Sequence, residues 1–203
     1  MKLDPFYLIV DSAQWIARLV PLGVKLVQLR IKDADDATLR REIRAAKAVC
    51  ERYDCVLVVN DYWWLAIEEG CRFVHLGQED LADADRAAIE HAGIRLGVSS
   101  HDDAELEASL AARPDYIALG PIYPTILKTM KWNPQGPERL ATWRERIGNL
   151  PLVAIGGLNP RRLPAVFENG ANSAAVVTDI TLSADPDART REWIAATERW
   201  RHQ

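Results

Sequence analysis

The chain has 203 residues, of which 48% are hydrophobic and 27% are charged, with 11 glycines and 11 prolines. This composition is typical of a globular protein and allows one sizeable hydrophobic core. The formal net charge of −4 gives no overall positive field that would attract nucleic acid or an anionic membrane, so we expect neither as a partner.

The first residues and the cysteines point to a cytoplasmic protein. The opening stretch "MKLDPFYLIVD" holds an apolar run that Asp4 and Pro5 interrupt, too short for the core of a secretory signal. No segment approaches the length needed to span a bilayer. Cys50, Cys55 and Cys71 lack metal-ligand spacing and have apolar neighbours, which indicates packing residues in a reducing compartment.

Short β-branched runs alternate with longer helical patterns along the chain. Helices are predicted at 36–53 and at 102–114, the second with Asp102 as its cap and Pro114 as its stop. Strict alternation predicts parallel strands joined by crossovers. The eight expected strands are 6–10, 25–30, 55–59, 72–76, 94–98, 115–119, 150–155 and 173–177.

Eight such units in one chain predict a compact α/β (β/α)₈ TIM barrel. A doubly wound open sheet is the alternative. Because no linker, low-complexity tract or charge block interrupts the pattern, we expect residues 1–203 to form a single domain. Functional groups of such a barrel gather where the strands end, in the loops at the carboxyl face.

The second expected strand ends in the unusual stretch "KLVQLRIKD". Successive side chains of a strand point to opposite faces, so Gln28, Arg30 and Lys32 share one face. Leu29 and Ile31 lie on the other face. Two cations and an amide at the end of a buried strand are costly to desolvate unless an anion meets them. The stretch therefore predicts an anion site.

Two carboxylates follow the next two strands. Asp61 comes after the third strand and Asp80 after the fourth. Neighbouring strands lie about 4.8 Å apart, so the two carboxylates can share one hard cation. Mg²⁺ is typically held by one or two carboxylates together with water and substrate phosphates. Either residue could instead simply cap the helix that follows it.

Several ring-bearing residues have structural explanations. His75 lies inside the fourth strand and is expected to be a core histidine with its hydrogen bonds satisfied. Trp63 and Trp64 are expected to pack a helix. Trp193 and Trp200 make the C-terminal helix rich in aromatic residues, which suits a homodimer contact or, equally, packing on the barrel.

The last two strand ends suggest a second anion site. Loops after the seventh and eighth strands commonly bind phosphate in this fold. Gly156 and Gly157 would let the backbone approach a ligand closely, and N–H groups near Val177 and Thr178 would donate to it. The glycine pair could also be only a tight turn, with Pro160 starting a helix.

The two sites together suggest a reaction class. Arg30, Lys32 and Lys128 would donate charge-assisted hydrogen bonds to a diphosphate, next to the metal. The sequence has no Ser-His-Asp arrangement, no positioned reactive cysteine and no Gly-rich nucleotide loop. Such a site suits the departure of pyrophosphate from a carbon, which leaves a stabilised cation for a second substrate to capture.

Seven stretches together resemble the thiamine-phosphate synthase family. They are "VQLRIKD", "VNDYWWLAIEEG", "VHLGQEDL", "LGVSSHDDAE", "YIALGPIYPT", "VAIGGL" and "AAVV", between Phe6 and Ile180. The resemblance implies a (β/α)₈ barrel and one Mg²⁺ per site. It implies small-molecule substrates: hydroxymethylpyrimidine diphosphate and a thiazole phosphate, or the carboxylated form of the latter. These would be joined dissociatively, giving thiamine phosphate and pyrophosphate.

Carried over by position, the resemblance also implies residue roles. Asp61 and Asp80 would bind Mg²⁺, and Arg30, Lys32 and Lys128 would be catalytic. Gln28, Asn60 and Ser99 would join those cations on the pyrimidine diphosphate. The thiazole phosphate would lie near Thr125, Gly157 and the 177–178 segment. The complete substrate-binding set is Gln28, Leu29, Arg30, Ile31, Lys32, Asn60, Ser99, Thr125, Ile126, Leu127, Lys128, Gly157, Val177 and Thr178.

The chain departs from the family pattern at two positions. Leu127 stands where Thr or Ser is usual, and losing that hydroxyl costs one hydrogen bond, about 1 kcal/mol. Asp179 stands in "VVTDI" where a small "SAI" is usual. If Asp179 points inward it should weaken binding of the thiazole phosphate, whereas an outward position is harmless.

Two other functions are compatible with the same fold. A thiazole tautomerase-like paralogue would share the thiazole phosphate pocket but would not need the diphosphate cations. A non-catalytic barrel that binds a phosphometabolite gains some support from Leu127 and Asp179. The synthase also predicts that the long connection at 120–135 closes over the substrates.

Overall fold

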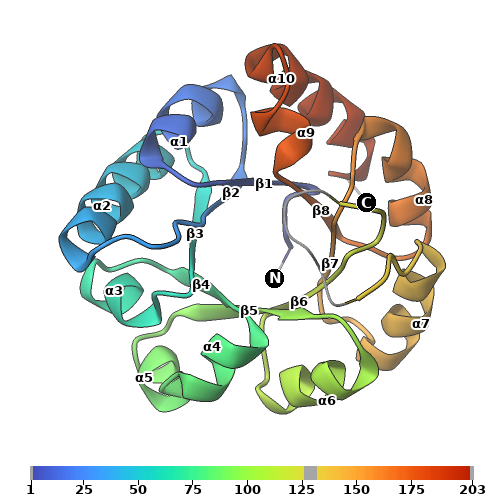
Figure 1. Ribbon diagram of the computed structural model, residues 1–203, viewed down its shortest axis with the longest axis horizontal. Helices are drawn as coiled ribbons and strands as arrows, with labels where there is room; N and C mark the ends of the chain where they lie inside the picture. Colours follow the sequence, from blue (N-terminus) through green and yellow to red (C-terminus); the bar gives the residue numbers. More distant parts are fainter. Residues whose placement is uncertain (1, 126–131, 202–203) are drawn as a thin grey trace.

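Eight parallel strands close into the ring seen in Figure 1. The computed structural model describes residues 2–125 and 132–201. Strand β1 pairs with β2 on one side and with β8 on the other, so the sheet has no free edge and the open-sheet alternative is excluded. The strands are β1 Phe6–Val10, β2 Leu26–Leu29, β3 Val56–Asn60, β4 Phe73–Leu76, β5 Arg95–Ser100, β6 Tyr116–Leu119, β7 Leu152–Ile155 and β8 Ser173–Val176.

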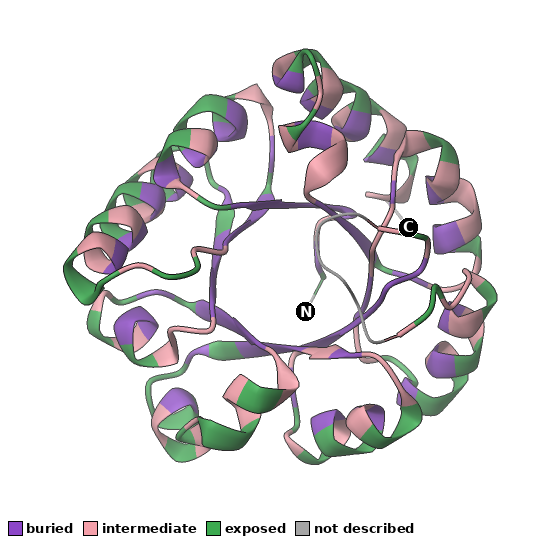
Figure 2. Ribbon diagram, in the orientation of Figure 1, coloured by how far each residue is buried: buried purple, intermediate pink, exposed green. Residues whose placement is uncertain are grey.

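Helices surround the ring, with buried inner faces and exposed outer faces (Figure 2). They are α1 Ala13–Leu19, α2 Asp36–Arg52, α3 Trp63–Glu68, α4 Gln78–Asp83, α5 Arg86–His91, α6 Asp103–Ala111, α7 Glu138–Ile147, α8 Leu163–Glu168, α9 Thr178–Thr181 and α10 Pro186–Thr197, with 3₁₀ turns η1 Val20–Leu22, η2 Pro160–Arg162 and η3 Glu198–Trp200. The predicted helices at 36–53 and 102–114 are confirmed as α2 and α6. Asp102 caps α6 by accepting a hydrogen bond from the N–H of Glu105 at 2.9 Å.

Alternate residues of the strands build two separate cores. One set faces the helices, and the other faces the inside of the barrel. The inner core consists of Leu3, Tyr7, Ile9, Leu26, Val58, Phe73, Tyr116, Ala118, Val153 and Ala175. Leu3 precedes β1, and the N-terminal segment lies within the ring in Figure 1. It therefore fills the barrel at the amino ends of the strands, and the opposite end remains for the site.

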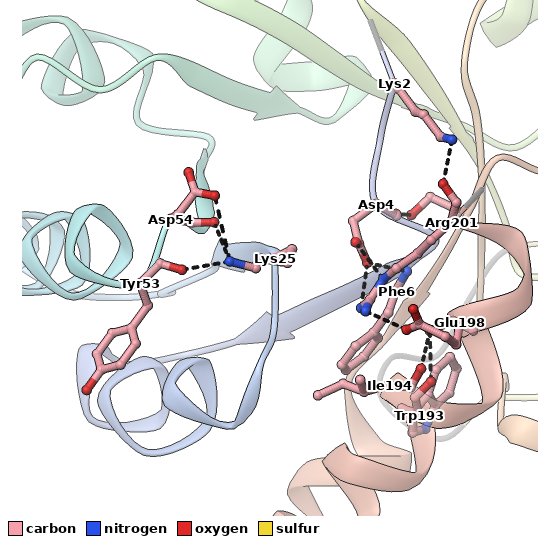
Figure 3. A network of polar contacts seen from close by, with 12 residues as sticks. Lys2, Asp4, Phe6, Lys25, Tyr53, Asp54, Trp193, Ile194, Glu198 and Arg201 are labelled. Atoms are coloured by element: carbon pink, nitrogen blue, oxygen red, sulfur yellow. Dashed lines mark hydrogen bonds and ion pairs between the residues drawn. The ribbon is translucent and has the colours of Figure 1, made fainter. Parts of the chain in front are cut away.

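The C-terminal segment contacts the start of the chain through hydrogen bonds and ring stacking (Figure 3). The guanidinium of Arg201 donates to the carboxylate of Asp4 at 3.1 Å. The buried indole of Trp193 stacks on Phe6, with ring centroids 5.5 Å apart. Trp200 stacks on the ring of Phe167 at 4.2 Å. The aromatic residues of this segment therefore pack on the barrel, and they give no support to a dimer contact.

Cys50, Cys55 and Cys71 are buried free thiols, as predicted for packing residues. Within residues 2–125 and 132–201, no helix is both long enough and apolar enough to cross a membrane.

Candidate active site

The alternation predicted for the second strand holds at Gln28, Leu29 and Ile31, while Arg30 and Lys32 lie past the end of β2. Gln28 is buried with 2% of its surface exposed, on the inner side of the barrel. The N–H of Arg30 donates to the carbonyl of Val10 at 2.8 Å, so the pairing with β1 continues one residue past β2. Leu29 lies in the outer core and Ile31 packs against it. Any contact of these two residues with a substrate would therefore come from the backbone.

Lys32 and Asp61 meet at the carboxyl face of the barrel. The ammonium of Lys32 forms an ion pair with the carboxylate of Asp61, whose side chain is 11% exposed. Asp61 has φ +65°, a left-handed conformation that is unfavourable for a residue with a side chain. Its N–H donates to the carbonyl of His75 at 2.9 Å. Helix α3 takes Tyr62 as its N-cap, without a side-chain hydrogen bond. The capping explanation of Asp61 is therefore wrong.

Asp80 lies in the first turn of α4, facing the same carboxylate. Burial raises the pKa of Asp80, and the negative charge and contact of Asp61 raise this pKa further, against a smaller opposing effect of Lys32. Two carboxylates in contact repel unless a proton or a cation lies between them. This donor pair fits Mg²⁺, which commonly takes one or two carboxylates and completes its shell with water and phosphate oxygens.

A chain of hydrogen bonds crosses the inside of the barrel below this rim. The amide Nε2 of Gln28 donates to the hydroxyl of Tyr7 at 2.8 Å. That hydroxyl lies 2.9 Å from the hydroxyl of Tyr116. The Tyr116 hydroxyl lies 2.7 Å from Nδ1 of His75, and Nε2 of His75 lies 2.7 Å from Oγ of Ser99. We call these five side chains the inner relay.

His75 is a core histidine with both ring nitrogens hydrogen-bonded, as predicted. Burial lowers the pKa of His75 to about 4, so the ring is neutral at physiological pH. The stacked ring of Tyr116 lies 5.5 Å away. Gly97 leaves the space for that ring, because a Cβ at this position would lie 2.1 Å from Cζ of Tyr116. The barrel is therefore shaped around the Tyr116 phenol.

The inner relay contains two residues that the sequence analysis missed, Tyr7 and Tyr116. Both are inward-facing strand residues, in phase with Ile9 and Ala118 of the inner core. The available signal was the two-residue period of each strand. Polar or phenolic residues at inward positions of several strands are expected to contact one another, because buried polar groups are nearly always hydrogen-bonded.

The glycine pair after β7 packs against the loop after β6. Gly156 and Gly157 have φ values of +102° and +63°. A Cβ on Gly157 would lie 2.3 Å from the carbonyl oxygen of Pro124, and one on Gly156 would lie 2.7 Å from Cα of Pro121. The glycines therefore allow a close approach to the 121–124 backbone, whereas the expected approach to a ligand stays a prediction. Pro160 begins η2, which agrees with the alternative interpretation of the glycine pair as a tight turn before a helix. Phosphate binding by this loop stays a prediction.

Val177 and Thr178 lead from β8 into α9. Both are partly buried, and the first N–H groups of a helix have no partner within it. Asp179 faces away from the barrel interior. Its carboxylate accepts two hydrogen bonds from Arg189, both at 2.8 Å, and one from the indole N–H of Trp193 at 2.7 Å. Both partners belong to α10, so the charge of Asp179 is neutralised on the outer side.

The connection between β6 and α7 is anchored at both ends. Thr125 is partly buried at the end of the first described range. Trp132, near the start of the second described range, stacks on His101 with ring centroids 3.9 Å apart. Ile126, Leu127 and Lys128 lie in the 126–131 segment, outside the described residues. Their predicted roles, and the closure of this connection, stay predictions.

Comparisons with known proteins agree on one family. The family model described as "Thiamine monophosphate synthase" matches residues 6–180. A thiamine-phosphate synthase of Rhizobium etli is 68% identical over 201 residues, covering 99% of this chain and 98% of that relative. Another, of Cronobacter sakazakii, is 50% identical over 193 residues, covering 95% and 89%.

Solved structures resemble this chain in fold. A thiamine phosphate pyrophosphorylase from Pyrococcus furiosus superposes with a TM-score of 0.86, covering 97% of this chain and 96% of that one. The two sequences are 24% identical, so this likeness supports the barrel alone.

Proposed function

The chain belongs to the thiamine monophosphate synthase family, and on this premise we propose that its site joins hydroxymethylpyrimidine diphosphate to a thiazole phosphate, giving thiamine phosphate and pyrophosphate. The observation that carries the proposal is the cluster of Lys32, Asp61 and Asp80 at the ends of neighbouring strands, above the inner relay. Cations and acidic metal ligands above the neutral inner relay suit a substrate with a diphosphate at one end and an uncharged ring at the other.

Arg30, Lys32, Asn60 and Lys128 would hold the diphosphate. Lys32 suits this role because its side chain is half exposed, while its partner Asp61 is nearly buried. A substrate phosphate arriving at the rim would meet the exposed ammonium first. Guanidinium and ammonium groups donate short charge-assisted hydrogen bonds to phosphate oxygens, and these bonds strengthen as the leaving group gains charge.

Asp61 and Asp80 would hold one Mg²⁺. Their contact and the raised pKa of Asp80 support this role, because a cation between two carboxylates offsets their repulsion. When bound, Mg²⁺ supplies positive charge that stabilises the departing pyrophosphate.

Thr125, Gly157, Val177 and Thr178 would hold the phosphate of the second substrate. Backbone N–H groups near the start of α9 would provide donors. The pairing of Asp179 with α10 supports this role, since it keeps the carboxylate away from the proposed pocket. Leu127 supplies no hydroxyl there, which we expect to cost a few-fold in affinity.

The reaction would proceed by departure before attack. The carbon–oxygen bond of the pyrimidine methylene breaks, and its electron pair leaves with pyrophosphate. The thiazole nitrogen then donates its lone pair to the resulting methylene cation and forms the carbon–nitrogen bond. No protein base is needed for either step, which suits a site whose only buried histidine among the described residues is hydrogen-bonded to two hydroxyls.

The test is pyrophosphate release from the purified protein with both substrates and Mg²⁺, each omitted in turn. Release that requires all three, together with formation of thiamine phosphate, is the expected result. A thiazole tautomerase or a non-catalytic barrel would bind thiazole phosphate without releasing pyrophosphate, and that outcome would refute the proposal.

A further inference from the structure

The inner relay has a definite direction, which follows from counting its hydrogens. The amide Nε2 of Gln28 donates to the hydroxyl oxygen of Tyr7. The Tyr7 hydroxyl has one other partner among the described residues, the hydroxyl of Tyr116, so its hydrogen must point there. A hydroxyl carries one donor hydrogen, and each step of the chain therefore fixes the next.

The same count fixes the tautomer of His75. The Tyr116 hydroxyl accepts from Tyr7, and its own hydrogen is left for Nδ1 of His75. Among the residues that the structure describes, no carboxylate hydrogen-bonds to this buried ring, and a neutral imidazole carries one hydrogen. That hydrogen is on Nε2 and points to Oγ of Ser99. The relay thus runs one way, from Gln28 to Ser99.

We propose that Tyr7, Tyr116 and His75 are positioning residues for the first substrate. Their one-way relay makes the hydroxyl of Ser99 an acceptor toward the protein, so that its hydrogen is a donor for the ligand. At the other end, Oε1 of Gln28 has no donor partner within residues 2–125 and 132–201, and it serves as an acceptor for the ligand.

The proposal rests on the proposed function, and it defines the face of the ring that the pocket reads. The group opposite Ser99 must accept a hydrogen bond, and the group opposite Gln28 must donate one. An aminopyrimidine offers both, as a ring nitrogen and an exocyclic amine. In the opposite ring orientation, the amine would face the Ser99 donor and the ring nitrogen would face the Gln28 acceptor. Buried polar atoms would then be left unpaired.

The first experiment measures the tautomer of His75 in the ligand-free protein. Nitrogen-15 NMR distinguishes a protonated ring nitrogen from an unprotonated one, and the spectrum of the His75→Gln variant assigns the signal among the four histidines. We expect the hydrogen on Nε2. A hydrogen on Nδ1 would mean that the relay runs from Ser99 to Gln28, and would overturn the proposal. This measurement does not depend on the reaction that the protein catalyses.

The second experiment measures coupling between Tyr7 and Ser99. The dissociation constant of hydroxymethylpyrimidine diphosphate is measured for wild type, Tyr7→Phe, Ser99→Ala and the double variant. We expect Tyr7→Phe to weaken binding about 2- to 10-fold, and to add nothing once Ser99 is alanine. Tyr53→Phe, at a more exposed tyrosine, is the matched control and should bind as wild type does.

The outcomes separate the relay from a structural role. Additive effects of Tyr7→Phe and Ser99→Ala would show that Tyr7 acts only on the fold, and would overturn the proposal. Should the wild-type protein not bind the diphosphate, the proposed function fails, while the tautomer of His75 still decides the direction of the relay.

Discussion

Replacing Asp179 tests whether its carboxylate only stabilises the packing of α10 or also repels the phosphate of the second substrate. The carboxylate accepts hydrogen bonds from Arg189 and from the indole N–H of Trp193, which is fully buried. Asp179→Ala removes both acceptors. Asp179→Asn keeps an oxygen for one donor and removes the charge.

The expected loss of stability follows from burial. Leaving the indole N–H of Trp193 without a partner costs about 1–3 kcal/mol. The pair with Arg189 is partly exposed, 22% for Asp179 and 26% for Arg189, so its loss adds only about 1 kcal/mol. We expect Asp179→Ala to lower the free energy of unfolding by about 2–4 kcal/mol, and Asp179→Asn by about 1 kcal/mol.

The assays are urea unfolding and steady-state kinetics with varied thiazole phosphate. Asp187→Ala, which breaks an exposed pair with Arg18, is the matched control and should cost less than about 1 kcal/mol. Because Asp179 faces α10, its removal should leave the KM for thiazole phosphate within about 2-fold, less than one ordinary hydrogen bond. A carboxylate about 4 Å from the phosphate would repel it by roughly 4 kcal/mol. A tenfold or greater fall in that KM would therefore refute the outward assignment.

Four further predictions concern the site and the core. Asp61→Asn should stay folded, since Asn tolerates the left-handed backbone, but should lower pyrophosphate release by about 100-fold or more and raise the Mg²⁺ requirement; near-normal release would remove Asp61 from the metal site. Lys128→Ala should give a folded barrel by circular dichroism with strongly reduced turnover, and unchanged turnover would contradict its assignment to the diphosphate. Gly157→Ala should lower the free energy of unfolding by about 1–3 kcal/mol, because its Cβ would lie 2.3 Å from the Pro124 carbonyl; a urea midpoint like that of wild type would show that the loop gives way freely. Burial raises the pKa of Cys71 to about 11, so its alkylation at pH 8 should be about 100-fold slower than that of an unfolded thiol. Because the thiol loses its proton at a higher pH in the folded state than in the unfolded state, the free energy of unfolding should fall as pH rises from about 9 to 11. Cys71→Ala should make this fall smaller.

The barrel was predictable because its strands are buried on both faces. Such strands read as continuous apolar runs, and each run ends where a helical period begins. The inward position of Gln28 was equally predictable, since a strand keeps its two-residue period. Contacts between neighbouring strands followed from their order, which is how Asp61 and Asp80 were placed together.

Contacts across the barrel were not predictable in this way. The inner relay joins β2, β1, β6, β4 and β5, and no local pattern indicates which inward side chains of distant strands will touch. The direction of Asp179 was also open, because a short helix after β8 can turn its side chain either way. Its partners Arg189 and Trp193 lie ten and fourteen residues further along the chain.

The layering of polar groups inside the barrel bears on the cationic intermediate of the proposed reaction. Lys32 and Asp61 lie at the rim, and the relay below them is neutral. His75 is held between a phenol and a hydroxyl, and burial lowers its pKa to about 4, so it is a poor base at neutral pH. In the proposed reaction, a stronger base at that depth could take an N–H proton from the amine of the pyrimidine cation, and so neutralise it before the thiazole nitrogen arrives. In the proposed reaction, this neutral floor would leave capture by the second substrate as the favoured fate of the cation.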